Sequence, residues 1–478
     1  MLAHWLRPVR RKLLIPLILL GLVVVGAGVA VAVLRVRGSE TAGKLETRVT
    51  DVSVEVEPEA TVTVPTTTAE KPTGKPTKHR RIRFLPDDKR CWLNFGGNPQ
   101  RTSARPDISL GRPTKHFWVK GLGAYIEYPP SYCDGTLYVN TVAGRTFALN
   151  AHNGKILWSH RNEGQTPSTP AIAGQLLLVS SHAGTLTALR RTDGKPIWKL
   201  RVRGKVESSP VAIGSTAYFG VTDGRLFAVA VRNGRVRWAY NTGGRINSSP
   251  SIWGRRICIT TYAGSIFCLD RRNGRKLWHR YIRRDVLRHE SFYASPSTDG
   301  RRLFTISRAG KVVALNARNG RVLWTHHLRS TGYSTPSVAH GRIYVGDFRG
   351  NVHAFRSGDG KEMWRTRVGG RILAPGLVVG KLVYFSTLNR KTFGLKTTNG
   401  QVVWRLGMGK YQPGIATDRH YFFSLNGIMI AYHATTPADY ELQNRRANAK
   451  ARAAAAKAKA RAKAKAAAKR KQAQPSGG

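Results

Sequence analysis

The sequence predicts an all-β fold made of eight similar units. Three observations indicate it: tryptophans recur at intervals near 40 residues, glycine turns precede most of them, and short β-rich runs such as GRIYVG lie between the turns. Repeats of about 40 residues with roughly four strands each are typical of the blades of a β-propeller. We therefore predict an eight-bladed β-propeller of four-stranded antiparallel blades over residues 85–436.

The tryptophans mark the units. A large aromatic side chain at a fixed position of the outer strand is expected to dock each blade against its neighbour, which is a structural role. The first tryptophan precedes the first complete unit, so its strand should join the last strands of the chain and close the ring, removing the exposed sheet edges. The eight tryptophans are Trp118, Trp158, Trp198, Trp238, Trp278, Trp324, Trp364 and Trp404.

A turn stands four residues before seven of these tryptophans, and Asn153-Gly154 is its first instance. Asn-Gly and Asp-Gly favour a type I′ hairpin, because both residues tolerate positive φ. A basic residue follows the glycine in six of the seven turns, and equivalent turns of a propeller lie on one face. The cationic ring that we expect there could dock an acidic partner or simply be a solvated rim. Its members are Lys155, Lys195, Arg235, Arg275, Arg321 and Lys361.

The start of the chain has the pattern of a membrane anchor. After a short basic segment, 1–12, the 22 residues 13–34 carry no charge. As a helix they would span roughly 33 Å, enough to cross the hydrocarbon core and longer than the apolar region of a cleaved signal peptide. We predict a transmembrane helix over 13–34, with 1–12 cytoplasmic, followed by a Thr/Pro-rich linker over 35–84.

Basic residues dominate the chain, with a formal net charge of +53. The tail, 437–478, carries twelve of them and is rich in alanine, so its composition favours a helix once the charge is screened. Such a tail is expected to bind a polyanion, and the alternative is a solvated tail without a partner. The expected partners are a protein or anionic envelope polymer for the propeller face and the tail, with nucleic acid as the less favoured choice.

The four cysteines form two sensible pairs. Cys258 and Cys268 flank a short turn, where they would face each other across a hairpin. Cys91 precedes the first blade and Cys133 lies within it, so a second bridge could pin the incoming segment. Two disulfides would place the propeller on an oxidising, extracytoplasmic side of the membrane. Buried free thiols are the alternative.

The repeated motifs resemble those of a known family. The stretches ALNAHNGKILW and ALNARNGRVLW, the SSP in VESSPVAIG and the leading CWLNFGGNPQRT are similar to the repeats of pyrroloquinoline quinone (PQQ) propellers. That family includes quinoprotein dehydrogenases and the non-enzymatic propeller lipoprotein of outer-membrane assembly, and the second type is the closer match. The aspartate usual in this motif is kept only at Asp270.

Catalysis is not expected. A quinoprotein dehydrogenase needs a calcium ion held by carboxylate and amide oxygens, a base and, in this family, adjacent cysteines. Residues 80–436 hold only 17 acidic residues and no adjacent cysteines, so we expect neither PQQ nor calcium, no metal site and no catalytic residue. Serines and threonines before the repeat prolines, such as Ser209, should lie near the central channel and bind the backbone.

These patterns predict a single-pass membrane protein with an extracytoplasmic propeller. Its function would be that of a non-catalytic binding scaffold in the cell envelope, with a polyanion-binding tail. The alternatives are a PQQ-dependent dehydrogenase and a cytoplasmic propeller that binds nucleic acid.

Overall fold

The computed structural model describes residues 20–25, 28–33, 91–108, 110–283 and 290–434. The chain forms two compact units, Met1–Thr77 and Lys78–Gly478. In the first unit, β1 (Leu20–Val25) pairs antiparallel with β2 (Gly28–Val33).

These two strands fall within the segment predicted to be a membrane helix, 13–34. Their valine-rich sequences, LGLVVV and GVAVAV, suit extended pairing, so the helix is not confirmed. The other residues of that segment lie outside the described residues, as do the linker 35–84 and the tail 437–478. No helix among the described residues is long and apolar enough to cross a membrane.

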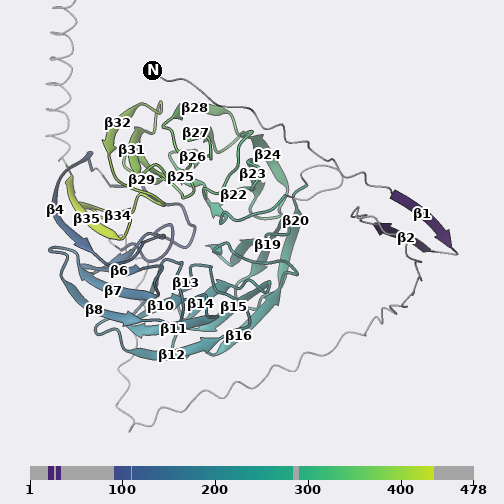
Figure 1. The fold of residues 1–478 in the computed structure, drawn as a ribbon, viewed down its shortest axis with the longest axis horizontal. Coiled ribbons are helices and arrows are strands. Elements are labelled where there is room, and N and C mark those ends of the chain that lie inside the picture. Colours follow the sequence, from purple (N-terminus) through teal and green to yellow (C-terminus); the bar gives the residue numbers. More distant parts are fainter. Residues whose placement is uncertain (1–19, 26–27, 34–90, 109, 284–289, 435–478) are drawn as a thin grey trace, which may run out of the picture. The chain divides into compact units, whose positions relative to one another are not determined.

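The second unit is an eight-bladed propeller, as predicted, and its blades follow one another around a ring (Figure 1). The first blade is β5 (Ser131–Cys133), β6 (Thr136–Asn140), β7 (Arg145–Asn150) and β8 (Ile156–Arg161). The second is β9 (Ala171–Ala173), β10 (Leu176–Ser180), β11 (Thr185–Arg190) and β12 (Pro196–Arg201). The third is β13 (Val211–Ile213), β14 (Thr216–Gly220), β15 (Arg225–Ala230) and β16 (Val236–Asn241). The fourth is β17 (Ser251–Trp253), β18 (Arg256–Thr260), β19 (Ser265–Asp270) and β20 (Lys276–Tyr281).

The remaining blades repeat this order. The fifth is β21 (Ser297–Thr298), β22 (Arg302–Ile306), β23 (Lys311–Asn316) and β24 (Val322–His327). The sixth is β25 (Ser337–Ala339), β26 (Arg342–Gly346), β27 (Asn351–Arg356) and β28 (Glu362–Arg367). The seventh is β29 (Leu377–Val379), β30 (Leu382–Thr387), β31 (Lys391–Lys396) and β32 (Val402–Leu406), and β3 (Ala104–Arg105) joins its inner edge.

The eighth blade closes the ring with strands from both ends of the propeller. It consists of β33 (Ile415–Ala416), β34 (His420–Leu425), β35 (Ile428–Ala434) and β4 (Pro113–Gly121). Trp118 on β4 pairs with Ala431 on β35, which confirms the predicted split blade. Figure 1 shows β4 along the outer side of β35.

The core lies between the blades. The middle strands are apolar and buried, as in LLLVS of β10, whereas the outer strand β12 alternates between exposed and half-buried residues. Leu178 of the second blade packs with Phe219 and Val229 of the third in one buried cluster. Each sheet is therefore covered on both faces by its neighbours, which explains why the inner strands read as apolar runs.

The blade topology defines two faces of the propeller. In an antiparallel four-stranded blade, the first and third turns lie at one end of the sheet. We call the face made by these ends the turn face; there Ala151 N donates to Gly135 O at 2.8 Å. The second turns and the connections between blades form the opposite, connector face, where Val142 N donates to Tyr125 O at 2.9 Å.

The third turn of each of the first seven blades differs from the predicted type I′ hairpin. Asn150 N donates to Lys155 O, so four residues lie between the paired positions, and Gly154 alone among them has positive φ, at 70°. The side chain of Asn153 accepts a hydrogen bond from Lys155 N at 3.0 Å, and all seven turns repeat this contact. Asn or Asp recurs because its side chain caps the turn.

Candidate functional site

The repeated tryptophans join the blades. Trp158 Nε1 donates to the carbonyl oxygen of Arg191 in the next blade at 2.8 Å, and seven of the eight tryptophans make the equivalent bond. Trp404 stacks on Phe423 of the eighth blade, with ring centroids 5.4 Å apart. All eight therefore have contacts that hold neighbouring blades together.

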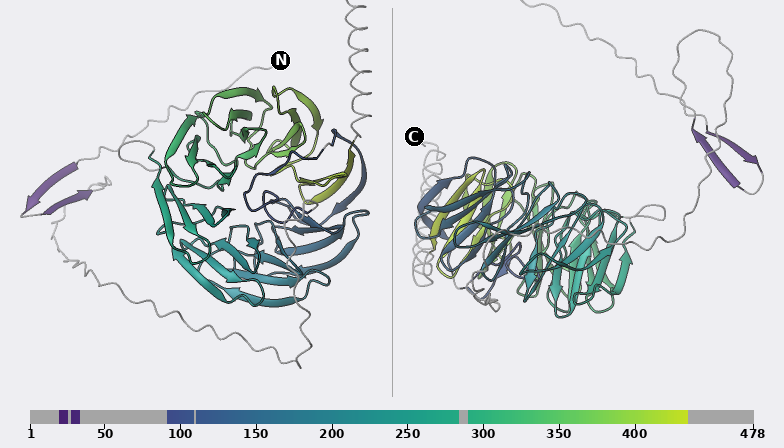
Figure 2. Two further views of the ribbon diagram at one scale, coloured as in Figure 1. Left: turned by 180° about the vertical axis from the view of Figure 1, so that it is seen from behind. Right: turned by 90° about the horizontal axis from the view of Figure 1, so that it is seen from below.

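The segment before the first blade crosses the centre of the ring (Figure 2). Its backbone carbonyls accept hydrogen bonds from the innermost strands of five blades. The donors are Ile172 N to Leu93 O, Ile252 N to Pro99 O, Thr298 N to Gln100 O, Val338 N to Thr102 O and Val378 N to Ser103 O, at 2.7–3.0 Å. We call residues 92–105 the central segment. It therefore lies along the inner edges of these five blades.

Arg101 anchors the central segment to the third and fourth blades. Its side chain is fully buried, and Nε donates to Pro250 O while Nη2 donates to Ser209 O, both at 2.9 Å. Burial lowers the pKa of Arg101 to about 9. Arg101 was not predicted as a site residue, although it lies in the NPQRT stretch that resembles the family motif. Its burial depends on backbone carbonyls of residues more than 100 positions away in the chain, which the local sequence does not reveal.

Hydroxyl groups link the blades in a chain around the centre. Thr169 N donates to Ser209 Oγ, and Ser209 N donates in turn to Ser249 Oγ, at 3.0 and 2.9 Å. The chain continues through Ser295 to Thr335. These side chains bind the backbone, as predicted, so they are structural acceptors.

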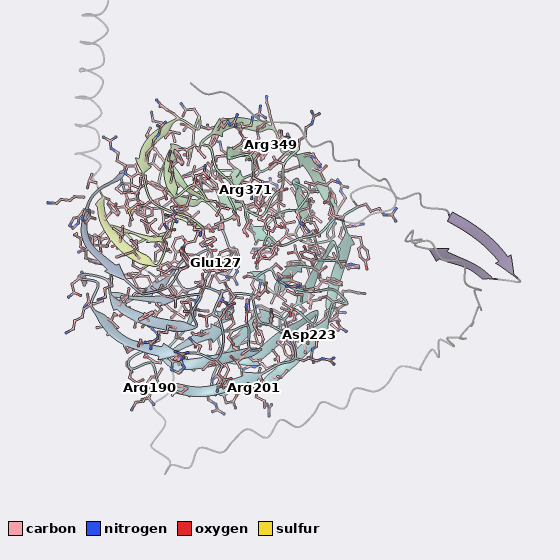
Figure 3. The ribbon with its side chains drawn as sticks, viewed as in Figure 1. Glu127, Arg190, Arg201, Asp223, Arg349 and Arg371 are labelled. Carbon is pink, nitrogen blue, oxygen red and sulfur yellow. A yellow bond between two sulfur atoms is a disulfide. The ribbon has the colours of Figure 1, made fainter. Side chains whose placement is uncertain are left out.

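An acidic spot lies at the centre of the connector face. Glu127 projects from the connection before β5, and Figure 3 shows it in the middle of the ring. Burial raises its pKa, and the nearby charge of Glu207 raises it further. Burial also raises the pKa of Tyr293 to about 12. Glu207 already has partners, because Arg245 lies 3.3 Å and His182 lies 3.6 Å from its carboxylate.

The described residues offer few clustered side chains that could hold a metal ion. Within those residues, one set of His, Cys, Asp and Glu has ligand atoms within 4.8 Å of one another: Cys91, Cys133 and Asp134. Its two cysteines are bridged to each other, so they are not available as ligands. Calcium prefers six to eight oxygen ligands, and this set offers one carboxylate.

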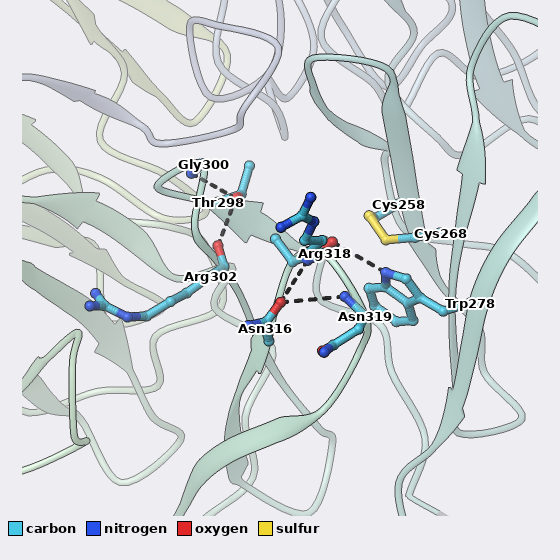
Figure 4. The surroundings of a disulfide bond; sticks show 10 residues. Cys258, Cys268, Trp278, Thr298, Gly300, Arg302, Asn316, Arg318 and Asn319 are labelled. Atoms are coloured by element: carbon cyan, nitrogen blue, oxygen red, sulfur yellow. Dashed lines mark hydrogen bonds between the residues drawn. A yellow bond between two sulfur atoms is a disulfide. The ribbon is translucent and has the colours of Figure 1, made fainter.

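Both predicted disulfides are confirmed. Cys258 and Cys268 face each other on β18 and β19 and are bridged (Figure 4). Cys91, just before the central segment, is bridged to Cys133 at the end of β5.

Asp270, two residues after Cys268, is buried. The hydrogen bond from Arg272 and the charge of Arg255 hold its pKa below the usual range.

The six residues of the predicted cationic ring are exposed on the turn face. They are Lys155, Lys195, Arg235, Arg275, Arg321 and Lys361. In the part of the chain that the structure describes, none of them lies within 4.0 Å of a carboxylate, whereas Arg190 and Arg356 in two of the same turns pair with Asp193 and Asp359. The turn face therefore carries uncompensated positive charge.

The fold and its contacts define a closed, eight-bladed propeller whose repeated residues serve to join its blades. The chain belongs to the family described as outer membrane protein assembly factor BamB, whose model matches residues 109–307 and 283–413. This agrees with the resemblance seen in the sequence.

Solved structures with the same fold include BamB and dehydrogenases. BamB from Moraxella catarrhalis is 16% identical with a TM-score of 0.58, and the match covers 67% of this chain and 99% of that one. A europium-containing methanol dehydrogenase is 12% identical with a TM-score of 0.61, covering 70% and 88%. The quinohemoprotein alcohol dehydrogenase from Comamonas testosteroni is 12% identical with a TM-score of 0.58, covering 72% and 76%. Among curated proteins, none matches this chain in sequence. At these identities the likeness concerns the fold alone.

Proposed function

We propose that the chain is a non-catalytic scaffold that binds a protein partner on the faces of its propeller. The observation that supports this most is that polar groups at the centre of the propeller are hydrogen-bonded to one another. The central segment and the hydroxyl chain engage the inner strands of the blades, and Arg101 is buried among backbone carbonyls. The groups left exposed are those of the two faces and the outer edge. Membership of the BamB family agrees with a binding function.

The scaffold is proposed to be membrane-anchored, with residues 13–34 in the membrane and the propeller on the extracytoplasmic side. The two disulfides support an oxidising compartment. The basic tail and the cationic ring are proposed to hold the protein against anionic polymer of the envelope. The tail carries twelve basic residues against two acidic ones, and the six ring residues have no carboxylate within 4.0 Å among the described residues.

Site-specific crosslinking tests the scaffold function. A photoreactive amino acid at Lys155 or Lys195 samples the turn face, and the same group at Leu157 samples the outer edge, where that side chain is 50% exposed. We expect a discrete crosslinked product in cells from the turn face and none from the edge. Equal yields from all three positions, or no product, would contradict the proposal.

Thiol labelling of intact cells tests the topology. We expect labelling only after reduction, because the four cysteines are bridged and the propeller is proposed to lie on the extracytoplasmic side. Free thiols that are labelled only after permeabilisation would place the propeller in the cytoplasm.

The dehydrogenase alternative has its own test, which the fold of the quinoprotein enzymes justifies. The purified chain is incubated with PQQ, calcium and a primary alcohol, and dye reduction is followed. We expect no turnover above a sample without protein. Quinone-dependent turnover would favour the enzyme.

A further inference from the structure

A pocket opens on the turn face between the fourth and fifth blades. Its volume is about 560 Å³, and it is lined by Trp253, Arg255, Arg256, Leu277 and Arg318. Trp253 ends β17, Arg256 begins β18 and Arg255 lies in the turn between them, while Leu277 lies on β20. Arg318 comes from the third turn of the fifth blade, after β23 (Figure 4). This volume lies in the range of small-ligand and peptide side-chain sites.

The pocket interrupts the repeat. The position of Trp253 at the end of the innermost strand is held by Ala173, Ile213 and Ala339 in three other blades. Trp253 instead presents an indole ring that is 37% exposed. Because the other blades are built without this ring, blade docking does not require it.

The guanidinium groups outnumber their acidic partners. Arg255 lies 3.0 Å from Asp270, which also pairs with Arg272. Arg256 stacks 5.4 Å from the centroid of the Trp253 ring, and its buried Nε has no hydrogen-bond acceptor among the described residues. Arg318 is exposed and forms no ion pair within those residues. The guanidinium groups of Arg256 and Arg318 therefore line the pocket with no carboxylate within 4.0 Å among the described residues.

We propose that this pocket receives an acidic segment of a protein partner, with a carboxylate on Arg256 and Arg318 and an apolar side chain against Trp253 and Leu277. The inference rests on the proposed scaffold function and names the chemistry of the partner. A carboxylate matches the planar fork of a guanidinium, so it is the anion that these two side chains favour. The apolar walls favour a peptide over a polyphosphate chain, in which every unit is charged and keeps its water.

Fluorescence anisotropy on the full-length protein in detergent tests this inference. The probe is a labelled peptide of alternating glutamate and leucine, and its glutamine–leucine counterpart is the uncharged control. The variants are Arg256→Gln and Arg318→Gln. Arg232→Gln is the matched control, because Arg232 occupies the position of Arg318 in the third blade, is also exposed and does not line the pocket.

We expect each pocket variant to weaken binding of the glutamate–leucine peptide about tenfold, and Arg232→Gln to change it less than about twofold. Since Arg318 is exposed, its substitution leaves the fold intact, which circular dichroism checks. Equal effects of Arg318→Gln and Arg232→Gln would show that the peptide responds only to the overall positive charge of the turn face. This result would overturn the inference. So would binding of inorganic polyphosphate that depends on Arg318 while the peptide does not. In either case the crosslinking test of the scaffold function remains separate, because it reports a partner whichever groups hold it.

Discussion

Gly194 in the second blade lies against the indole ring of Trp158 in the first, so that a Cβ atom at position 194 would come 2.5 Å from Cε3. The same contact joins seven turn glycines to the tryptophan of the preceding blade. Each turn thus closes its own hairpin and also forms the surface on which the neighbouring blade docks. Glycine is needed there for its positive φ, 72° at Gly194, and for its lack of a side chain.

Replacing Gly194 by alanine should therefore destabilise the propeller through both backbone strain and overpacking. We expect a loss of about 2–4 kcal/mol in the free energy of unfolding, measured by urea denaturation. Gly243→Ala is the matched control, since Gly243 has a φ of 70° and open space around its Cβ position. It should lose only about 1 kcal/mol. Equal losses would mean that the contact with Trp158 adds nothing.

The two disulfides should differ in their contribution to stability. Cys91 and Cys133 are 42 residues apart, whereas Cys258 and Cys268 are 10 apart. Because the longer loop loses more entropy when it is closed in the unfolded chain, the double alanine variants should lose about 4 and about 3 kcal/mol respectively. Denaturation midpoints of both variants, without reductant, give the order. The reverse order would show that native contacts outweigh loop closure.

The environment of Asp270 makes the free energy of unfolding depend on pH. The hydrogen bond from Arg272 lowers the pKa of Asp270 in the folded protein. A carboxyl group whose pKa is lowered by folding stabilises the protein above its unfolded pKa of about 3.9, and this contribution is lost as the pH falls through the folded pKa. Asp270→Asn should therefore lower the free energy of unfolding by about 1 kcal/mol at pH 7, with the difference from the wild type shrinking toward pH 3.

Urea denaturation at the two pH values checks this expectation. Asp359→Asn is the control, because Asp359 is 52% exposed in its ion pair with Arg356 and should change stability by less than about 0.5 kcal/mol. A difference for Asp270→Asn that is the same at pH 7 and pH 3 would exclude the carboxylate charge as its cause.

The hydroxyl chain at the centre gives a further prediction. Ser209→Ala removes the buried acceptor of Thr169 N and leaves that donor unpaired. The free energy of unfolding should fall by about 1–3 kcal/mol, as seen in thermal or urea denaturation. Ser215→Ala is the control; Ser215 is exposed, and its loss should change stability by less than about 0.5 kcal/mol. Equal changes in the free energy of unfolding would show that the hydroxyl chain does not stabilise the packing of the blades.

Much of the propeller could be predicted from the residues alone. The spacing of Trp158 and its equivalents depends on one repeated local unit, so blade number, strand order and the pairing of Trp118 with the last strands followed from it. The type I′ turn was wrong, because the side chain of Asn153 caps a longer loop in which only the glycine has positive φ. The positions of the turns were predicted correctly, but the hydrogen bonds within them could not be predicted from the residue pattern.

What the sequence determined by itself is the repeat: its period, the positions of its turns, its docking tryptophans and the pairing of Cys258 with Cys268, because each rests on contacts between residues close in the chain or at a fixed spacing. The tertiary structure decided what lies at the centre and on the faces. The burial of Arg101 depends on carbonyls 108 and 149 residues away, and the pocket at Trp253 needs side chains from two blades. Neither feature recurs with the repeat. Each depends on residues that are distant in the chain and that only the packing of the blades brings together.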